Sequence, residues 1–179
     1  MTPDGSGDYF GWGEVQPRSY YGWGDYKYSD YDVKMTKYCT NSSYGKVDNK
    51  TILELTDDAA YVNWAGNWRM PTYEEFDELK NNCTWTWTTQ DGIKGYKVTG
   101  KNGNSIFLPS VGYQDNHGLC DAGYNGYYWS SSLVLDNGEN RDAYGFYFDY
   151  LGTVDWCLQY YGSIGKSRYC GLSVRPVCP

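Results

Sequence analysis

The balance between aliphatic and aromatic residues limits the kind of core that this chain can build. Leu, Ile, Val and Phe together number 29 of the 179 residues, or about 16%, which alone would be typical of a disordered chain. The sequence also contains 21 Tyr and 8 Trp, and each of these rings buries a large apolar area. We therefore expect a folded domain, long enough for one core, in which Trp and Tyr supply much of the packing.

Charge and hydropathy exclude several classes of partner. The net charge is −7 and the 15 basic residues form no run, so no nucleic acid partner is expected. No stretch approaches the roughly 20 apolar residues of a membrane span, and no membrane insertion of this domain is expected. Residues 1–8 lack the pattern of a secretory signal and are predicted to be a flexible lead-in. Residues 9–179 are predicted to form a single domain, and an exported parent protein remains open.

Cysteine and histidine usage gives no sign of a metal site. The six cysteines are Cys39, Cys83, Cys120, Cys157, Cys170 and Cys178. Their even number permits disulfides, whose connectivity the sequence does not specify, and free buried thiols are the alternative. None of the cysteines form CxxC pairs, and His117 is the only histidine. The usual zinc-ligand spacing is therefore missing, and neither metal nor cofactor is expected.

Two helices are indicated in the first half of the chain. Thr56 precedes two aspartates, which predicts a helix over Thr56–Trp64 that ends at Gly66. Thr72 followed three residues later by Glu75 forms a capping box, and this second helix should end near residues 81–82.

The second half changes to short strands separated by turns. The predicted strands are Thr84–Thr88, Tyr96–Thr99, Ser105–Leu108, Tyr127–Ser130, Ala143–Phe148, Val154–Trp156 and Leu172–Val177. Turn dipeptides at Asp91-Gly92 and Asn102-Gly103 separate some of them, and the second suits a tight hairpin. Helices followed by antiparallel strands predict an α+β domain.

Several aromatic residues are better explained by packing than by binding. The segments FGWGE and YGWGD within residues 9–28 predict two aromatic turns in an arm that packs on the domain. Core positions are predicted for Tyr144, Phe146 and Phe148, and core or core-rim positions for Trp68, Trp129 and Trp156. Arg69 and Arg175 are predicted to be structural hydrogen-bond donors.

Several stretches together resemble a known family. WAGNWRMPTYEEF (64–76), NGNSIFLPSVGY (102–113), GYYWSSS (126–132) and GLSVRPVCP (171–179) are similar to the Fibrobacter succinogenes major paralogous domain family. FGWGE and residues 37–60 resemble its N-terminal portion. The resemblance implies a C-type-lectin-like fold with two helices and short antiparallel strands.

The same resemblance implies a variable protein of a diversity-generating retroelement, in which adenines near the 3′ end of the gene are randomised. Randomising an AAC or AAT codon can yield Tyr, Asp, Asn, Ser, Gly, Cys, Leu, Val and others, but not Lys, Glu, Gln, Met or Trp. Between Gly126 and Arg175 the excluded types are Trp129, Glu139, Trp156, Gln159 and Lys166. These five positions are therefore expected to be fixed.

The residues around these fixed positions are the predicted ligand-binding set, in a variable region over about residues 124–170. They are Val134, Leu135, Asn137, Gly145, Tyr147, Asp149, Tyr150, Asp155, Cys157, Leu158, Tyr160, Tyr161, Tyr169 and Cys170. Strand alternation places Gly145 and Tyr147 opposite Phe146. Tyrosine suits such a surface because it gives contact area with little loss of rotamer freedom. Cys157 and Cys170 could form a disulfide, be a reactive pair or be accidents of mutagenesis, and the last interpretation is favoured.

The resulting functional hypothesis is a non-enzymatic ligand- or receptor-binding protein that is extracellular, on a cell surface or on a virion. Its expected partner is an unknown protein or glycan on a cell surface. Metal-independent glycan binding and a structural surface domain are alternatives. A formylglycine-generating-type enzyme would use Cys157 and Cys170 with a metal, but the RGGSW-like segment of such enzymes is missing. The calcium-ligand motifs EPN, QPD and WND of C-type lectins are also missing.

Overall fold

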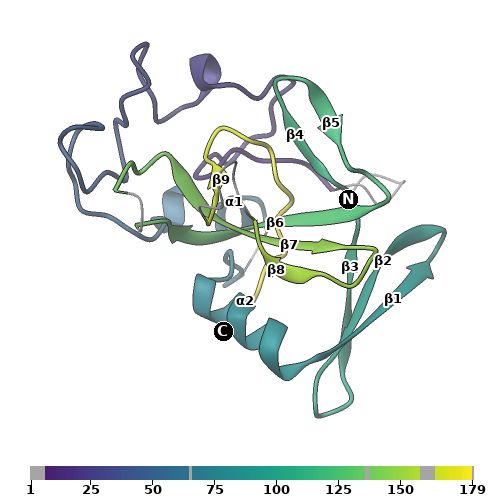
Figure 1. The fold of residues 1–179 in the computed structure, drawn as a ribbon. Coiled ribbons are helices and arrows are strands. Elements are labelled where there is room, and N and C mark those ends of the chain that lie inside the picture. The colour runs from purple at the N-terminus through teal and green to yellow at the C-terminus, as the bar shows by residue number, and fades with distance from the viewer. Residues whose placement is uncertain (1–6, 65, 136–137, 158–163, 179) are drawn as a thin grey trace.

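The computed structural model describes residues 7–64, 66–135, 138–157 and 164–178, and these form a mixed α+β domain. Within these ranges there are two α-helices, α1 (Ala59–Asn63) and α2 (Tyr73–Asn82), and two short 3-10 helices, η1 (Trp23–Asp25) and η2 (Leu55–Asp57). The strands lie mostly in antiparallel sheets (Figure 1). The predicted α+β class is therefore confirmed.

Helix α2 begins where the sequence predicts. The Thr72 side chain accepts a hydrogen bond from the Glu75 backbone N–H, and the Glu75 carboxylate accepts one from the Thr72 N–H. Arg69 pairs with the same carboxylate through both terminal guanidinium nitrogens, each at 2.7 Å. The capping box and the structural role of Arg69 are both confirmed.

The first helix begins later than predicted. Thr56 lies within η2, and the N-cap of α1 is Asp58. The Asp58 carboxylate accepts hydrogen bonds from the backbone N–H groups of Ala60 and Tyr61, and its other oxygen accepts one from Met70 at 2.8 Å. A carboxylate accepts several backbone bonds at once, whereas a threonine hydroxyl usually satisfies one. This difference explains why the cap moves to Asp58.

The strands form three sheets. They are β1 (Thr84–Gln90), β2 (Ile93–Thr99), β3 (Ser105–Pro109), β4 (Tyr113–Asp115), β5 (Gly118–Cys120), β6 (Asn125–Leu133), β7 (Asp142–Asp149), β8 (Val154–Trp156) and β9 (Lys166–Ser167). One sheet has the order β1-β2-β3, β4 pairs with β5, and the central sheet has the order β6-β7-β8 with β9 also paired to β7. At the β1–β2 turn Asp91 and Gly92 both have positive φ, 51° and 83°, as a two-residue hairpin turn requires.

One predicted strand is absent as a continuous element. Leu172, Ser173 and Val177 make isolated bridges to three different partners, Phe10, Tyr128 and Arg69. A segment that changes partner every few residues does not form a ladder, so the prediction of a strand over Leu172–Val177 was wrong. The other six predicted strands are confirmed.

The central sheet separates two aromatic clusters. On the side of α2 and β1–β3, Phe76 stacks on Phe146 with centroids 4.7 Å apart, and Phe148 is fully buried beside them. On the other side, Trp12 and Trp129 are fully buried among residues of the N-terminal third. Figure 1 shows this region and the β4–β5 hairpin on the side of the sheet away from α2. The predicted aromatic core is confirmed.

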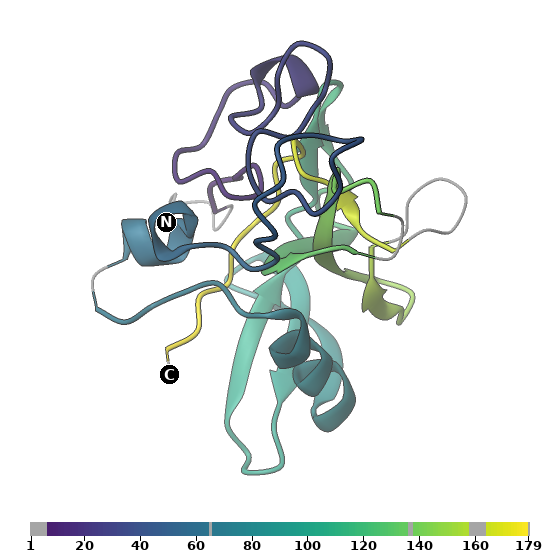
Figure 2. The ribbon, with the colours of Figure 1, turned by 90° about the vertical axis from the view of Figure 1, so that its left-hand side faces the viewer.

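The N-terminal arm is an integral part of the second cluster. Phe10 pairs with Leu172, the Trp12 indole donates to the Ser130 carbonyl at 2.8 Å, and the Trp129 indole donates to the Phe10 carbonyl at 2.7 Å. Figure 2 shows the purple N-terminal segment beside the yellow C-terminal one. The predicted packing of the arm is confirmed, and it extends to the centre of the core.

The predicted core or core-rim position of Trp68 was wrong. Its side chain is 38% exposed, whereas Trp129 and Trp156 are buried as predicted. Trp68 follows Gly66, whose φ of 97° marks the turn after α1. The residue therefore lies in a surface connection between the two helices.

All six cysteines are free thiols, and Cys39, Cys157 and Cys170 are buried. The structure therefore agrees with free thiols, three of them buried, and not with disulfides. No helix in the described part of the chain is long and apolar enough to cross a membrane.

Candidate functional site

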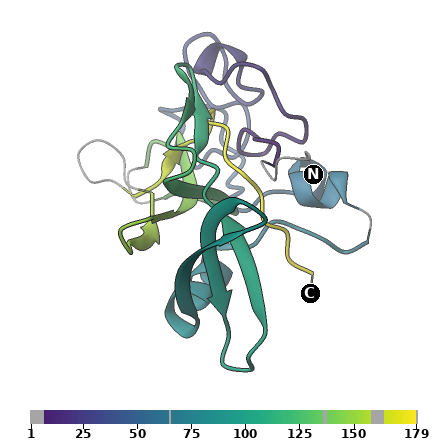
Figure 3. The ribbon, with the colours of Figure 1, turned by 90° about the vertical axis from the view of Figure 1, so that its right-hand side faces the viewer.

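A cavity of about 640 Å³ opens beside the end of the central sheet that carries β8 and β9. It is lined by Tyr113, Asp115, Tyr127, Tyr147, Thr153, Asp155, Trp156, Cys157, Lys166, Ser167, Tyr169 and Cys170, and we refer to it as the tyrosine cavity. The β4–β5 hairpin stands next to this end of the sheet (Figure 1, Figure 3).

Three tyrosines form one aromatic wall. Tyr127 on β6 lies directly opposite Tyr147 on β7, and their ring centroids are 5.1 Å apart. Tyr113 on β4 packs on Tyr127 from the other side, at 4.8 Å with an edge-to-face angle of 65°. Cross-strand aromatic pairs of this kind stabilise a sheet and fix the rings. The wall is thus set by strand register.

The hydroxyls of this wall point to acidic residues. Tyr127 donates to Asp121 at 2.7 Å, and Tyr147 donates to Asp149 at 3.2 Å. Burial, followed by these neighbouring carboxylates, raises the pKa of both phenols above the usual value. Both hydroxyls therefore remain neutral donors in any ordinary buffer.

Lys166 places its ammonium against the wall. Its Nζ lies 3.5 Å from the centroid of the Tyr113 ring and 5.6 Å from that of Tyr127. The pairing of Lys166 with Ala143 in the β7–β9 ladder fixes its backbone. Among the described residues, no carboxylate forms an ion pair with Lys166. The contacts recorded for its ammonium are with the faces of Tyr113 and Tyr127.

The floor of the cavity contains two thiols. Cys157 and Cys170 are each 3% exposed, and burial raises the pKa of both thiols to about 12. Both are therefore protonated near neutral pH, and a protonated thiol is a poor nucleophile and a poor metal ligand. Gly145 makes room for this floor, since a Cβ there would lie 2.9 Å from the Cys157 sulfur.

Acidic residues lie around the opening. Asp155 pairs with Lys80 at 2.6 Å, and this hydrogen bond lowers the pKa of Asp155. Asp115 accepts a hydrogen bond from the His117 backbone N–H at 2.7 Å. The cavity therefore combines neutral rings and carboxylates with one internal ammonium.

The predicted binding residues divide into three groups. Tyr147, Asp155, Cys157, Tyr169 and Cys170 line the tyrosine cavity together. Asn137, Leu158, Tyr160 and Tyr161 lie outside the described residues. The remaining positions are Val134, Leu135, Gly145, Asp149 and Tyr150, and they are not part of the cavity lining.

These remaining positions differ in exposure. Tyr150 is 50% and Leu135 47% exposed, but Val134 is 1% exposed and packs under Gly165. Gly145 is buried as well. The alternation predicted for β7 holds, with Phe146 facing α2 and Tyr147 facing the cavity. However, Val134 and Gly145 are both covered by neighbouring segments, and this corrects their assignment as surface positions.

Sequence reasoning missed seven lining residues: Tyr113, Asp115, Tyr127, Thr153, Trp156, Lys166 and Ser167. Trp156 and Lys166 were set aside because randomisation cannot produce them, yet a fixed residue can still line a site. Tyr113 and Asp115 precede the expected variable region and reach the cavity through the β4–β5 hairpin. The available signal was the Tyr-Gln-Asp sequence before a tight turn.

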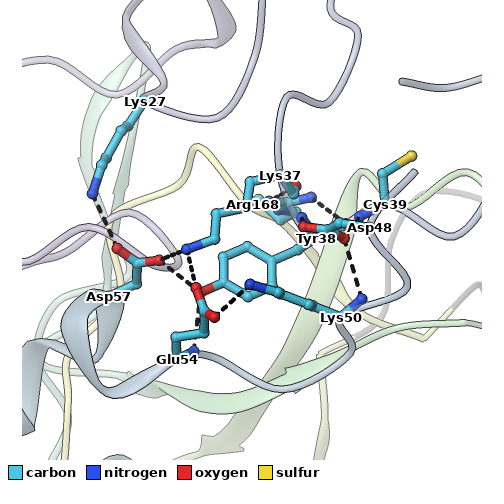
Figure 4. Close-up of polar contacts among 9 residues, drawn as sticks. All are labelled: Lys27, Lys37, Tyr38, Cys39, Asp48, Lys50, Glu54, Asp57 and Arg168. Carbon is cyan, nitrogen blue, oxygen red and sulfur yellow. Dashed lines mark hydrogen bonds and ion pairs between the residues drawn. The ribbon is translucent and has the colours of Figure 1, made fainter. Parts of the chain in front are cut away.

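A second polar cluster lies among the N-terminal residues and is closed by its own contacts (Figure 4). Asp57 accepts hydrogen bonds from Lys27 at 3.2 Å, Lys37 at 2.5 Å and the Tyr38 hydroxyl at 2.7 Å. Glu54 pairs with Lys37 and Lys50. Because these charges satisfy one another, the cluster is structural. The tyrosine cavity is the candidate site because five of the predicted binding residues meet there.

Comparison with protein-family models, curated proteins and solved structures finds no match to this chain. Among the described residues, no group of three or more His, Cys, Asp or Glu is placed to hold a metal ion. The functional conclusion therefore depends on the site and on the sequence.

Proposed function

We propose that this protein is a non-enzymatic ligand- or receptor-binding protein, a variable protein of a diversity-generating retroelement on a C-type-lectin-like scaffold. The observation that carries the proposal is the meeting of five of the predicted variable positions at one cavity. Trp129 and Trp156, which it cannot produce, are buried parts of the frame. Predicted variable side chains thus line the site, and two tryptophans that are expected to be fixed are buried in the core.

The packing of the fold also supports this division between a fixed frame and variable side chains. The central sheet is packed on both faces by aromatic clusters, so its strands are held rigidly while one end faces the cavity. Tyr147 and Tyr169 offer ring faces and hydroxyls with few rotatable bonds. A rigid frame with such side chains loses little entropy when it binds.

Two stretches of the segments that carry the family resemblance lie in the frame. WRMPTYEEF contains the Arg69–Glu75 pair and the start of α2, and WSSS lies in β6. NGNSIFLPSVGY and GYYWSSS also supply Tyr113 and Tyr127 to the cavity lining, so the proposed site combines fixed and variable residues. The proposed partner is a protein or glycan on a cell surface, and the proposed location is extracellular, on a cell surface or on a virion.

Sequencing sibling copies of the gene and the neighbouring DNA tests the proposal. We expect substitutions concentrated at the predicted positions other than the buried Val134 and Gly145, constant residues at Trp156 and Lys166, a near-identical template repeat and a reverse transcriptase gene. Substitutions scattered evenly over residues 1–179, with no template repeat, would refute it.

Metal-independent glycan binding is a second candidate, favoured by the combination of tyrosine rings with Asp115 and Asp155 in one cavity. Rings stack on sugar faces, and carboxylates accept hydrogen bonds from sugar hydroxyls. A glycan array run with and without chelator tests it. Binding that chelator does not change supports this candidate, and an empty array removes it.

A formylglycine-generating-type enzyme is favoured less, although Cys157 and Cys170 line the same cavity. Their raised pKa works against thiolate chemistry. Stoichiometric copper binding that is lost in Cys170→Ser would support this enzyme, and no copper binding would exclude it.

A further inference from the structure

The tyrosine cavity has the composition of a site for a positively charged group. Its lining includes four tyrosines and Trp156, whose ring faces carry partial negative charge. Asp115 and Asp155 line it as well, and Asp121 and Asp149 hold the tyrosine hydroxyls of the wall. Aromatic faces combined with carboxylates favour ammonium and guanidinium groups.

The best place for such a group is already filled by the protein itself. The Lys166 ammonium lies 3.5 Å from the Tyr113 ring centroid, a distance typical of direct cation–π contact. No ion pair with a carboxylate of the described chain holds it there. At a partly open site, such a cation–π contact therefore favours the ring-bound position of the ammonium over a solvated one by only about two- to fivefold.

The Lys166 side chain is free to leave while its backbone stays in place. The β9 backbone is fixed by pairing with β7, and the lysine stem is a flexible four-carbon chain. A stronger cation could therefore take its place without opening the sheet.

We propose that the tyrosine cavity receives a cationic group, the ammonium or guanidinium of a basic side chain on the partner, and that Lys166 is an internal competitor displaced on binding. This inference rests on the proposed function for the role of the cavity as a binding site. It adds the chemical class of the ligand, and it makes Lys166 a competitor of the ligand instead of a residue that binds it.

The opposite assignment, in which Lys166 binds an anion, is disfavoured by charge. Four aspartates lie at or next to the cavity, and within the described part of the chain the basic side chains recorded beside them are Lys80 at Asp155 and His117 at Asp115. The whole chain carries −7. An anion at Lys166 would be surrounded by like charges.

The two assignments give effects of opposite sign in one variant. Lys166→Gln removes the competitor and should strengthen binding of a cation, whereas loss of an anchor would weaken binding of an anion. Lys101→Gln is the matched control, since Lys101 is exposed at the β2–β3 turn and the charge change is equal. Tyr113→Phe keeps the ring face and Tyr113→Leu removes it.

The test is an NMR titration of the ¹⁵N-labelled full chain at constant ionic strength. The probes are tetramethylammonium chloride, tert-butanol as a neutral molecule of similar shape, and sodium acetate. Amide shifts at residues 113, 147 and 166 report occupancy, and the same spectra show whether each variant is folded.

We expect saturable shifts with tetramethylammonium alone, and binding about two- to fivefold tighter in Lys166→Gln than in Lys101→Gln. Tyr113→Phe should bind as the unmodified protein does, and folded Tyr113→Leu should not bind. Equal or weaker binding of the cation in Lys166→Gln, or acetate binding that this variant loses, would overturn the inference. A failure of the sibling sequencing would remove the retroelement proposal but leave this titration valid.

Discussion

Replacing Arg168 by Met should remove much of the stability of the domain. Arg168 is completely buried, and its guanidinium donates to the Tyr26 hydroxyl at 2.9 Å and to the carbonyls of Asn140, Tyr38 and Lys37 at 2.9, 3.2 and 3.0 Å. It also lies over the Trp12 ring, 4.9 Å from the centroid. The side chain therefore joins the N-terminal third to the end of the central sheet.

The magnitude follows from the acceptors left behind. Each buried acceptor without a donor costs about 1–3 kcal/mol, while removing a buried charge returns part of its desolvation penalty. Four acceptors lose their donor, and three of these hydrogen bonds are buried while the one to the Lys37 carbonyl is partly buried. We therefore expect a net loss of about 3–5 kcal/mol in the free energy of unfolding. Because domains are usually stable by about 5–15 kcal/mol, this loss would remove a large fraction of the free energy of unfolding.

Urea unfolding followed by tryptophan fluorescence measures this loss. Lys101→Met removes the same charge at an exposed position and should change the free energy of unfolding by no more than about 0.5 kcal/mol. A loss below about 1 kcal/mol in Arg168→Met, with an unchanged urea dependence, would refute the role given to these hydrogen bonds.

Three further predictions concern packing, pH and thiol reactivity. Gly145→Ala should cost about 1–3 kcal/mol by crowding the cavity floor, whereas Gly24→Ala, where a Cβ meets nothing within 4 Å, should be nearly neutral; equal urea midpoints would contradict this. The hydrogen bond from the Arg69 guanidinium lowers the pKa of Glu75 below 4.5 in the folded protein, so the stability that ionised Glu75 contributes is present above pH 4.5 and is lost as the pH falls through the folded-state pKa. The difference in urea midpoint between the unmodified protein and Glu75→Gln should therefore shrink between pH 6 and pH 3. A constant difference would contradict this prediction. Ellman's reagent at pH 8 should react rapidly with exposed Cys178 and slowly with buried Cys157, and rapid loss of both thiols would show that the cavity floor is open.

Local signals in the sequence were reliable where the structure is local. The Thr72–Glu75 capping box, the Asp91-Gly92 turn and the alternation around Phe146 each depend on residues within one turn or one strand. Each was predicted correctly because its physical cause is contained in a short segment.

Features that depend on distant partners were predicted poorly. The cap at Asp58 is reinforced by the Met70 backbone, which the helix pattern does not reveal. The Leu172–Val177 segment looks like a strand but contacts three separate neighbours. The tyrosine cavity needs the β4–β5 hairpin beside β9, and neither spacing nor codon arithmetic places Tyr113 against Lys166.

The reciprocal indole bonds of Trp12 and Trp129, with the Phe10–Leu172 bridge, have a consequence for biosynthesis. The segment around Phe10 and Trp12 has its native neighbours far along the chain, so its contacts stay unmade until residues 129, 130 and 172 have been translated. Chains truncated before residue 172 should therefore yield protease-sensitive products instead of a smaller stable domain.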